Sequence, residues 1–314
     1  QSQWLWAGYQ TRPFSAVERL LTEPRILWFY LRLMISPRLE DLGLYHDDIA
    51  LSTNLISPWT TWPAIAGLVG VGYLVWRTRV RSPLVSFGIV WFLVGHIMES
   101  TLLPLELAHE HRNYVPLFGV LLVGAWPFIL SLESQGEIRT AGITFLAAML
   151  SYSALITGLR ADQFGDAARR TQVEAMNHRT SARAQYEAGQ YLAGLAEAAK
   201  ANEPIYSLAS AHFERACELD GNSKMCLLGP IYLSCKAGVT VKAELVSELR
   251  KRMKETPFAP GDRNVLNSVK DMAIAETICL TRPDIDGLFA AALVNPSVTP
   301  GVQAMLHSWH ADYL

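Results

Sequence analysis

One short stretch carries most of the chain's candidate chemistry. His109, Glu110, His111, Arg112 and Tyr114 lie within LELAHEHRNYVPLFG, directly before an apolar segment. Ionisable groups near membrane depth are costly and usually functional. An arginine here can bind a phosphate through two parallel hydrogen bonds, and Glu110 could orient that arginine or bind a sugar hydroxyl. An ordinary solvated loop whose charges anchor a helix end explains the pattern equally well.

A second cluster, in GLYHDDIALS, places His46, Asp47 and Asp48 after Tyr45. Paired carboxylates beside a histidine could bind a divalent cation or act in acid/base chemistry. The favoured interpretation is a helix N-cap or a solvated turn with two acidic residues. The alternating His109 and His111 would suit one metal ion only on a strand, so no zinc site is expected there.

The elements beside these clusters are apolar and long. Four stretches have few or no charges and approach the ~20 residues that cross a bilayer: Pro58–Trp76, Pro83–Met98, Val115–Leu132 and Thr140–Leu159. Arg77, Arg79 and Arg81 follow the first stretch and mark its end as cytoplasmic by the positive-inside rule. This topology predicts that the clusters above, and everything after the fourth crossing, face the outer compartment.

Three regions follow from this pattern: an outer loop over residues 1–57, a transmembrane domain over residues 58–159 and a water-soluble domain over residues 160–314. Within the first, the stretch Ala16–Ile35 is ambiguous, because its apolar part, Arg25–Ile35, has only about 11 residues between Pro24 and Ser36 and is interrupted by Arg32. That length favours an interfacial or re-entrant helix over a crossing. The chain starts at Gln1 without a leader-like segment, so we expect further sequence upstream.

Composition agrees with a chain that meets two solvents. It is 50% hydrophobic and 18% charged, below the ~25% charge of ordinary soluble domains, and charged residues recur regularly only from Arg160 onward. The net charge of -2, with no basic patch, argues against a nucleic-acid partner. The later segments have three- and four-residue apolar spacing, so the predicted fold class is all-α.

All four cysteines fall in the soluble domain. Cys226 and Cys235 would lie roughly 13 Å apart on one helix at 1.5 Å per residue, too far for a bridge. Cys217 and Cys226, on either side of an interhelical turn, are the better pair, and buried free thiols are the alternative. The spacing of the cysteines does not suggest zinc.

Two segments of the soluble domain resemble a tetratricopeptide repeat. AHFERACELDGNS (Ala211–Ser223) is similar to its second helix and turn, and AQYEAGQYLAG (Ala184–Gly194) is similar to its first helix. The repeat is ~34 residues long. A generic helical bundle is the alternative.

The order of these features resembles the C-terminal half of the transmembrane and tetratricopeptide-repeat glycosyltransferases, which include protein O-mannosyltransferases and have the C-type (GT-C) membrane fold. The resemblance rests on TEPRILWFYLRLMISPRLEDLGLYHD, a tryptophan-rich crossing ending in LLP, and EHRNYVP, and covers roughly Thr22–Leu228. Glu110, Arg112, Tyr114 and Pro116 fit the family's loop pattern.

The resemblance implies a bacterial inner-membrane enzyme that transfers a sugar from a polyprenyl-phosphate donor to an acceptor in the periplasm. Its catalytic acidic residue would lie in an earlier outward loop outside this chain. Arg112 and Arg25 would bind the donor phosphate, and the helical repeats would present the acceptor or dock a protein partner. A non-catalytic membrane subunit that uses the helical domain as a docking surface is the alternative, and a transporter has less support.

Overall fold

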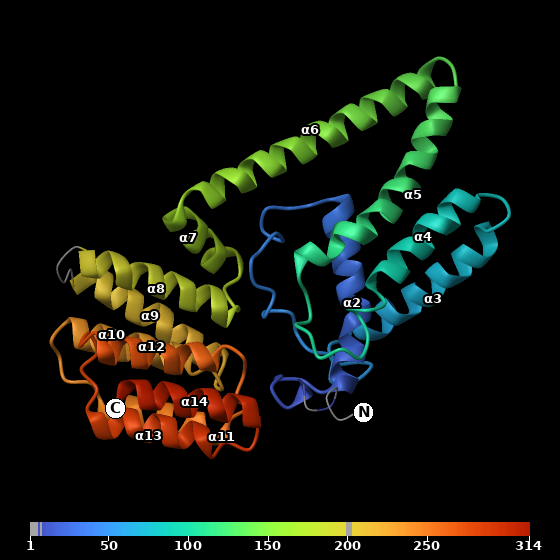
Figure 1. Ribbon diagram of the computed structural model, residues 1–314. Helices are drawn as coiled ribbons and strands as arrows, with labels where there is room; N and C mark the ends of the chain where they lie inside the picture. The colour runs from blue at the N-terminus through green and yellow to red at the C-terminus, as the bar shows by residue number, and fades with distance from the viewer. Residues whose placement is uncertain (1–5, 7, 199–202) are drawn as a thin grey trace. The chain divides into compact units, whose positions relative to one another are not determined.

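The protein is described by a computed structural model that covers residue 6, residues 8–198 and residues 203–314 (Figure 1). The described residues form helices, turns and loops without a strand, which confirms the all-α prediction. Contacts divide the chain into two compact units. We call Phe14–Arg170 the N-terminal unit and Thr171–Leu314, with which the described residues before Phe14 are grouped, the C-terminal unit.

The N-terminal unit contains five α-helices among its described residues, and one 3-10 turn that leads directly into the fourth. They are α2 (Ala16–Ile35), α3 (Thr61–Thr78), α4 (Pro83–His96), η1 (Glu110–Asn113), α5 (Tyr114–Glu133) and α6 (Glu137–Gly165). Helix α2 packs on α3, α4 pairs closely with α5, and α5 contacts α6. The long connection between α4 and η1 carries the polar residues of the candidate site.

Helix α2 is longer than the eleven-residue segment that the sequence suggested. It begins at Ala16 because Ser15 and Glu18 form a capping box, in which each side chain accepts a hydrogen bond from the other's backbone N–H. Pro24 lies inside the helix without ending it. The helix carries several charged side chains, and it is not among the helices apolar enough to cross a membrane.

Two described helical segments are long and apolar enough to cross a membrane: Glu110–Glu133 with 24 residues and Glu137–Gly165 with 29 residues. At 1.5 Å per residue the second is ~44 Å long, against a hydrocarbon core of ~30 Å. Only 11% and 0% of their apolar windows are buried within the protein. Their length, apolar character and exposure make these two helices candidate membrane spans.

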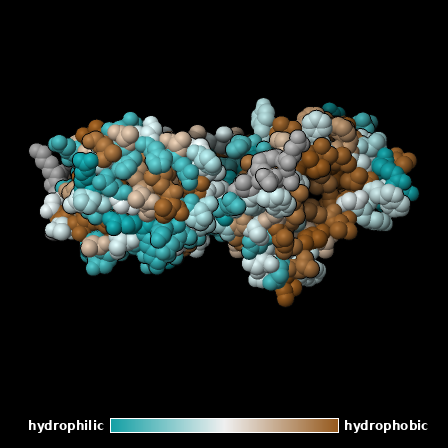
Figure 2. All heavy atoms as spheres, turned by 60° about the horizontal axis from the view of Figure 1, so that its bottom comes forward, coloured by the Kyte–Doolittle hydropathy of each residue, from teal (hydrophilic) through white to brown (hydrophobic). Residues whose placement is uncertain are grey.

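The surfaces of the two units differ in hydropathy. Figure 2 shows hydrophobic residues gathered over the N-terminal unit and hydrophilic residues over most of the C-terminal unit. Helix α4 is apolar but has only 14 residues, and α3 does not meet the same criterion of length and hydropathy. The crossings predicted at Val115–Leu132 and Thr140–Leu159 therefore coincide with candidate spans. Those at Pro58–Trp76 and Pro83–Met98 remain predictions.

Helices α4 and α5 approach each other through two glycines. A Cβ atom placed on Gly119 would lie 2.2 Å from the carbonyl oxygen of Gly88, and one on Gly88 would lie 2.6 Å from the carbonyl oxygen of Gly119. Both distances are far below van der Waals contact. Small residues at such a crossing let backbones pack where no hydrophobic effect drives association, as in membrane helix pairs.

The C-terminal unit contains α7 (Ala167–Asn177, whose first turn precedes Thr171), α8 (Ala182–Ala198), α9 (Glu203–Leu219), α10 (Met225–Lys236), α11 (Ala243–Glu255), α12 (Asp262–Ile274), α13 (Arg282–Leu293) and α14 (Pro300–Tyr313). Helix α8 packs along α9, and α10 packs on both. Beyond that point helices pair with the next but one: α11 with α13, and α12 with α14. Their shared core includes Leu249, Leu266 and Leu288, which are fully buried.

Candidate functional site

The EHRN sequence forms the 3-10 turn η1, and a side chain of α2 holds the residue that precedes this turn. The backbone N–H of His109 donates to the hydroxyl of Tyr30 at 2.7 Å. Burial raises the pKa of Tyr30 to about 12, so its hydroxyl stays protonated and neutral. Tyr30 also stacks on His96 with ring centroids 5.2 Å apart. The buried side chain of Tyr30 on α2 thus holds the start of the loop His109–Tyr114, which we call the site loop.

Arg112 lies inside the loop with only 7% of its side chain exposed. Its Nε pairs with Glu99 Oε2 at 3.0 Å, and its Nη1 donates to the carbonyl oxygens of Glu106 at 2.7 Å and Leu107 at 3.3 Å. These contacts tie the loop back onto itself. In this arrangement, the guanidinium that the sequence predicts to bind a phosphate holds the residues around it in place.

Glu110 joins the two clusters that the sequence analysis treated separately. Its Oε1 accepts a hydrogen bond from the backbone N–H of Gly43 at 2.8 Å and lies 3.4 Å from His46 Nε2. His46 is buried and meets the ring of Phe29 edge-on at 5.2 Å. The GLYHDD loop and the EHRNY loop therefore form one structure, 67 residues apart in sequence at the Gly43–Glu110 contact.

Asp47 and Asp48 lie in a turn beside this contact, with Asp47 exposed and Asp48 half-buried. Among the residues that the structure describes, no group of three or more His, Cys, Asp or Glu side chains is placed to hold a metal ion. The favoured interpretation of these two aspartates, a polar turn, agrees with their position.

Arg25 holds a different segment of the N-terminal unit. Its Nη1 donates to the carbonyl oxygen of Ala50 at 2.6 Å and to Ser52 Oγ at 3.3 Å. The pKa of Arg25 is lowered by partial burial. Ser52 Oγ is in turn 2.8 Å from Thr61 Oγ1 at the start of α3. Arg25 and Arg112 therefore each hold a different loop in place.

Sequence reasoning missed the most buried charges in this unit, Arg19 and Glu23. Their side chains are 0% and 3% exposed and pair at 2.7 Å. Arg19 also donates to the carbonyl oxygens of Glu99, Thr101 and Leu105. It therefore clamps the long connection that leads to η1. The available signal was an Arg-Glu pair four residues apart on a helix face that also carries apolar side chains.

Glu23 is held in an environment that disfavours its charge. Burial raises its pKa from 4.5 to about 7, although Arg19 acts in the opposite direction. Glu99 lies close enough to raise the pKa further, and Arg112 lowers it. The four groups form one network of two arginines and two carboxylates, in which only Glu99, at 27%, is appreciably exposed.

The groups that face outward from this framework are the histidines and a tyrosine. His111 is exposed, and 86% of Tyr114 is exposed at the start of α5. The rings of His109 and His111 lie 4.8 Å apart, and His109 Nε2 lies 2.9 Å from Glu106 Oε2. Partial burial lowers the pKa of His109, which favours the neutral imidazole that can accept a proton.

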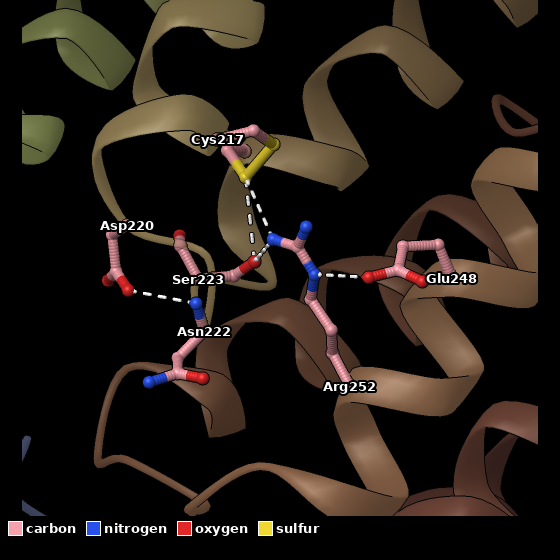
Figure 3. Close-up of a disulfide and its surroundings, with 7 residues drawn as sticks. Cys217, Asp220, Asn222, Ser223, Glu248 and Arg252 are labelled. Carbon is pink, nitrogen blue, oxygen red and sulfur yellow. Dashed lines mark hydrogen bonds and ion pairs between the residues drawn. A yellow bond between two sulfur atoms is a disulfide. The ribbon is translucent and has the colours of Figure 1, made fainter.

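In the C-terminal unit, disulfides join Cys217 to Cys226 and Cys235 to Cys279. Figure 3 shows Arg252 beside the first of these, with its Nη1 3.8 Å from Cys226 Sγ. The same Nη1 donates to the carbonyl oxygen of Ser223 at 2.8 Å, and its Nε donates to Glu248 Oε1 at 2.8 Å. Arg252 thereby fastens the α9–α10 turn to α11.

Searches against protein-family models, curated proteins and solved structures return no match to this chain.

Proposed function

We propose that this protein is part of a membrane glycosyltransferase that takes a sugar from a polyprenyl-phosphate donor and places it on an acceptor outside the cytoplasm. The observation that carries the proposal is the position of His111 and Tyr114. Both are exposed where the site loop runs into α5, the start of a candidate membrane span. A lipid-linked sugar would present its phosphate and sugar at this level.

In this proposal Arg112 positions the loop, and the histidines meet the ligand. His109 and His111 could hydrogen-bond a phosphate oxygen or a sugar hydroxyl, and His109 could accept a proton from an acceptor hydroxyl. Glu110 and His46 would keep the loop in place from the other side. The donor-binding role assigned to Arg25 would likewise be indirect, through the loop that carries Ser52.

The proposed topology has four crossings, with α3 and α4 adding a pair to α5 and α6. Gly88 and Gly119 support it, because their close approach suits helices packed in lipid. The two disulfides support a C-terminal unit in an oxidising compartment such as the periplasm, where such bonds persist. The α8–α9 hairpin and α10 packed on it suit a tetratricopeptide-like arrangement that presents an acceptor.

The test is sugar transfer by membranes that contain the full-length protein and a radiolabelled polyprenyl-phosphate sugar. His111→Ala should lower the transfer rate at least tenfold while leaving the amount of folded protein unchanged. His307→Ala is the matched control, because His307 is an exposed histidine on α14 far from the loop in sequence. Equal transfer by wild type and His111→Ala would remove this residue from the site and undermine the proposal.

A second candidate function, docking of a protein partner, is favoured by a hollow of about 490 Å³ in the C-terminal unit. Arg179, His212 and Arg215 line it together with Met176, Leu192 and Leu208, and no carboxylate is among its lining residues. Such a surface suits an acidic segment with apolar neighbours. Co-purification of one stable complex that Arg215→Glu abolishes, with no sugar transfer by wild type, would favour this function over the first.

A further inference from the structure

A hollow of about 420 Å³ lies beside the C-terminal part of α6, within the N-terminal unit. From α6 it is lined by Ser153, Ile156, Thr157, Arg160, Ala161 and Phe164, and the loop after α2 contributes Pro37 and Leu42. The hydroxyl of Tyr152 donates to the carbonyl oxygen of Pro37 at 2.6 Å. This hydrogen bond holds the loop against α6, and the loop forms the wall of the hollow opposite the helix.

The position of Arg160 along α6 fixes the depth of this hollow. No charged residue occurs between Arg139 and Arg160, which are 21 positions apart. That separation corresponds to ~32 Å of helix, close to the ~30 Å thickness of the hydrocarbon core. When α6 crosses the bilayer, Arg160 therefore lies at the level of the lipid phosphates on one side and Arg139 at the other.

The chemistry of the lining suits an anionic lipid. Arg160 is the single charged residue among those that line the hollow. Two hydroxyl groups lie on the same helix face, that of Thr157 about one turn earlier and that of Ser153 about two turns earlier. The guanidinium lies 4.6 Å from the Phe164 ring and donates to Gln163 Oε1 at 3.1 Å. These contacts orient it at the apolar hollow, where arginine pairs well with a phosphate.

We propose that this hollow binds the phosphate of an anionic lipid, with Arg160 and Thr157 contacting the phosphate and the lipid chain following α6 toward Ile156. The inference rests on the membrane location proposed for α6 and not on the sugar-transfer reaction. Two sources share this chemistry: the phosphodiester of an anionic phospholipid and the monophosphate of a polyprenyl lipid. Both carry a net negative charge, which a zwitterionic phospholipid lacks.

The experiment is native mass spectrometry of the full chain in detergent, titrated with phosphatidylglycerol, with a polyprenyl monophosphate or with phosphatidylcholine. We expect the first equivalent of at least one anionic lipid to bind wild type at least tenfold more tightly than phosphatidylcholine. Arg160→Ala should lose most of that difference. Arg139→Ala, which removes the arginine at the opposite end of the same span, should retain it.

A second variant separates loss of lipid binding from loss of folding. Thr157→Trp fills the hollow from an exposed position of α6 without removing a charge, and it should weaken the same binding at least tenfold. The anionic lipid that binds more tightly, phosphatidylglycerol or the polyprenyl monophosphate, identifies the source of the phosphate. Equal affinity for anionic and zwitterionic lipids, or unchanged binding by folded Arg160→Ala and Thr157→Trp, would overturn the proposal. A chain that stays monodisperse without detergent would instead overturn the membrane location itself.

Discussion

The two units of this protein use polar and apolar residues in opposite ways. The N-terminal unit buries Arg19, Glu23 and Arg112 and leaves the apolar faces of α5 and α6 uncovered. The C-terminal unit buries leucines, a methionine and phenylalanines in two apolar clusters and is cross-linked by two disulfides. This difference is what the proposed location predicts, with the N-terminal unit in lipid and the C-terminal unit in water. Lipid permits exposed apolar helices, and water requires them to be covered.

The largest effect is expected from the buried charges of the N-terminal unit. Arg19→Met removes a guanidinium that is fully buried and leaves the Glu23 carboxylate without its partner. Breaking a buried pair in this way costs about 3–5 kcal/mol. We expect hydrogen exchange over residues 99–112 to rise sharply, as measured by mass spectrometry in detergent.

The control for Arg19 is Arg32, which lies on the same helix and pairs with Asp41 while 49% of its side chain is exposed. Exposed pairs contribute about 0–1 kcal/mol, so Arg32→Met should leave exchange in residues 99–112 nearly unchanged. Similar effects of the two substitutions would show that the Arg19 clamp does not hold the loop.

In the C-terminal unit, two disulfides take the structural role that buried ion pairs have in the N-terminal unit. The Cys235–Cys279 bridge closes 44 residues and the Cys217–Cys226 bridge closes 9. Loop-closure entropy assigns them about 4 and about 2.5 kcal/mol of stability, respectively. Replacing each pair by serine should therefore destabilise this unit to unfolding by urea in that order. The opposite order would show that strain or packing, and not chain entropy, sets the effect.

A further stability effect in the N-terminal unit depends on pH. The pKa of Glu23 rises from 4.5 to about 7 on folding, so the folded state holds its proton more tightly than the unfolded state. Its contribution to stability is complete below about pH 4.5 and is lost as pH rises through about 7. Relative to Glu23→Gln, wild type should lose roughly 3 kcal/mol between pH 4.5 and 8.

Parallel unfolding curves for wild type and Glu23→Gln at four pH values within this range would check the effect. The difference between the two proteins isolates Glu23 from the other titrating groups. A difference that does not vary with pH would mean that the buried carboxylate stays ionised throughout, held by Arg19 and Arg112.

Local patterns in the sequence predicted a good part of the fold. The all-α class, the two long apolar helices and the hairpin of α8 and α9 follow from residue spacing and hydropathy, which act over one or two helical turns. The extent of α2 was missed because Pro24 suggested a boundary, whereas the capping box at Ser15 starts the helix two turns earlier.

The candidate site was less predictable because tertiary contacts define it. Glu110 meets Gly43 across 67 residues, and Arg19 reaches carbonyl oxygens more than 80 residues away. No local pattern encodes such contacts, so the sequence could not show that Arg112 is enclosed. The same applies to cysteines: the turn brings Cys217 near Cys226, but the bridge from Cys235 to Cys279 depends on how distant helices pack.

The most direct test of the two-solvent account is spin-label accessibility in lipid nanodiscs. The four native cysteines are all in disulfides, so a label on Phe145→Cys in α6 or on Val239→Cys in the C-terminal unit is unique. These side chains are similarly exposed in the structure, at 70% and 60%. The account predicts that the label at position 145 collides with dissolved oxygen but not with a water-soluble nickel complex, and that the label at position 239 does the reverse. Equal collision with nickel at both positions would contradict it.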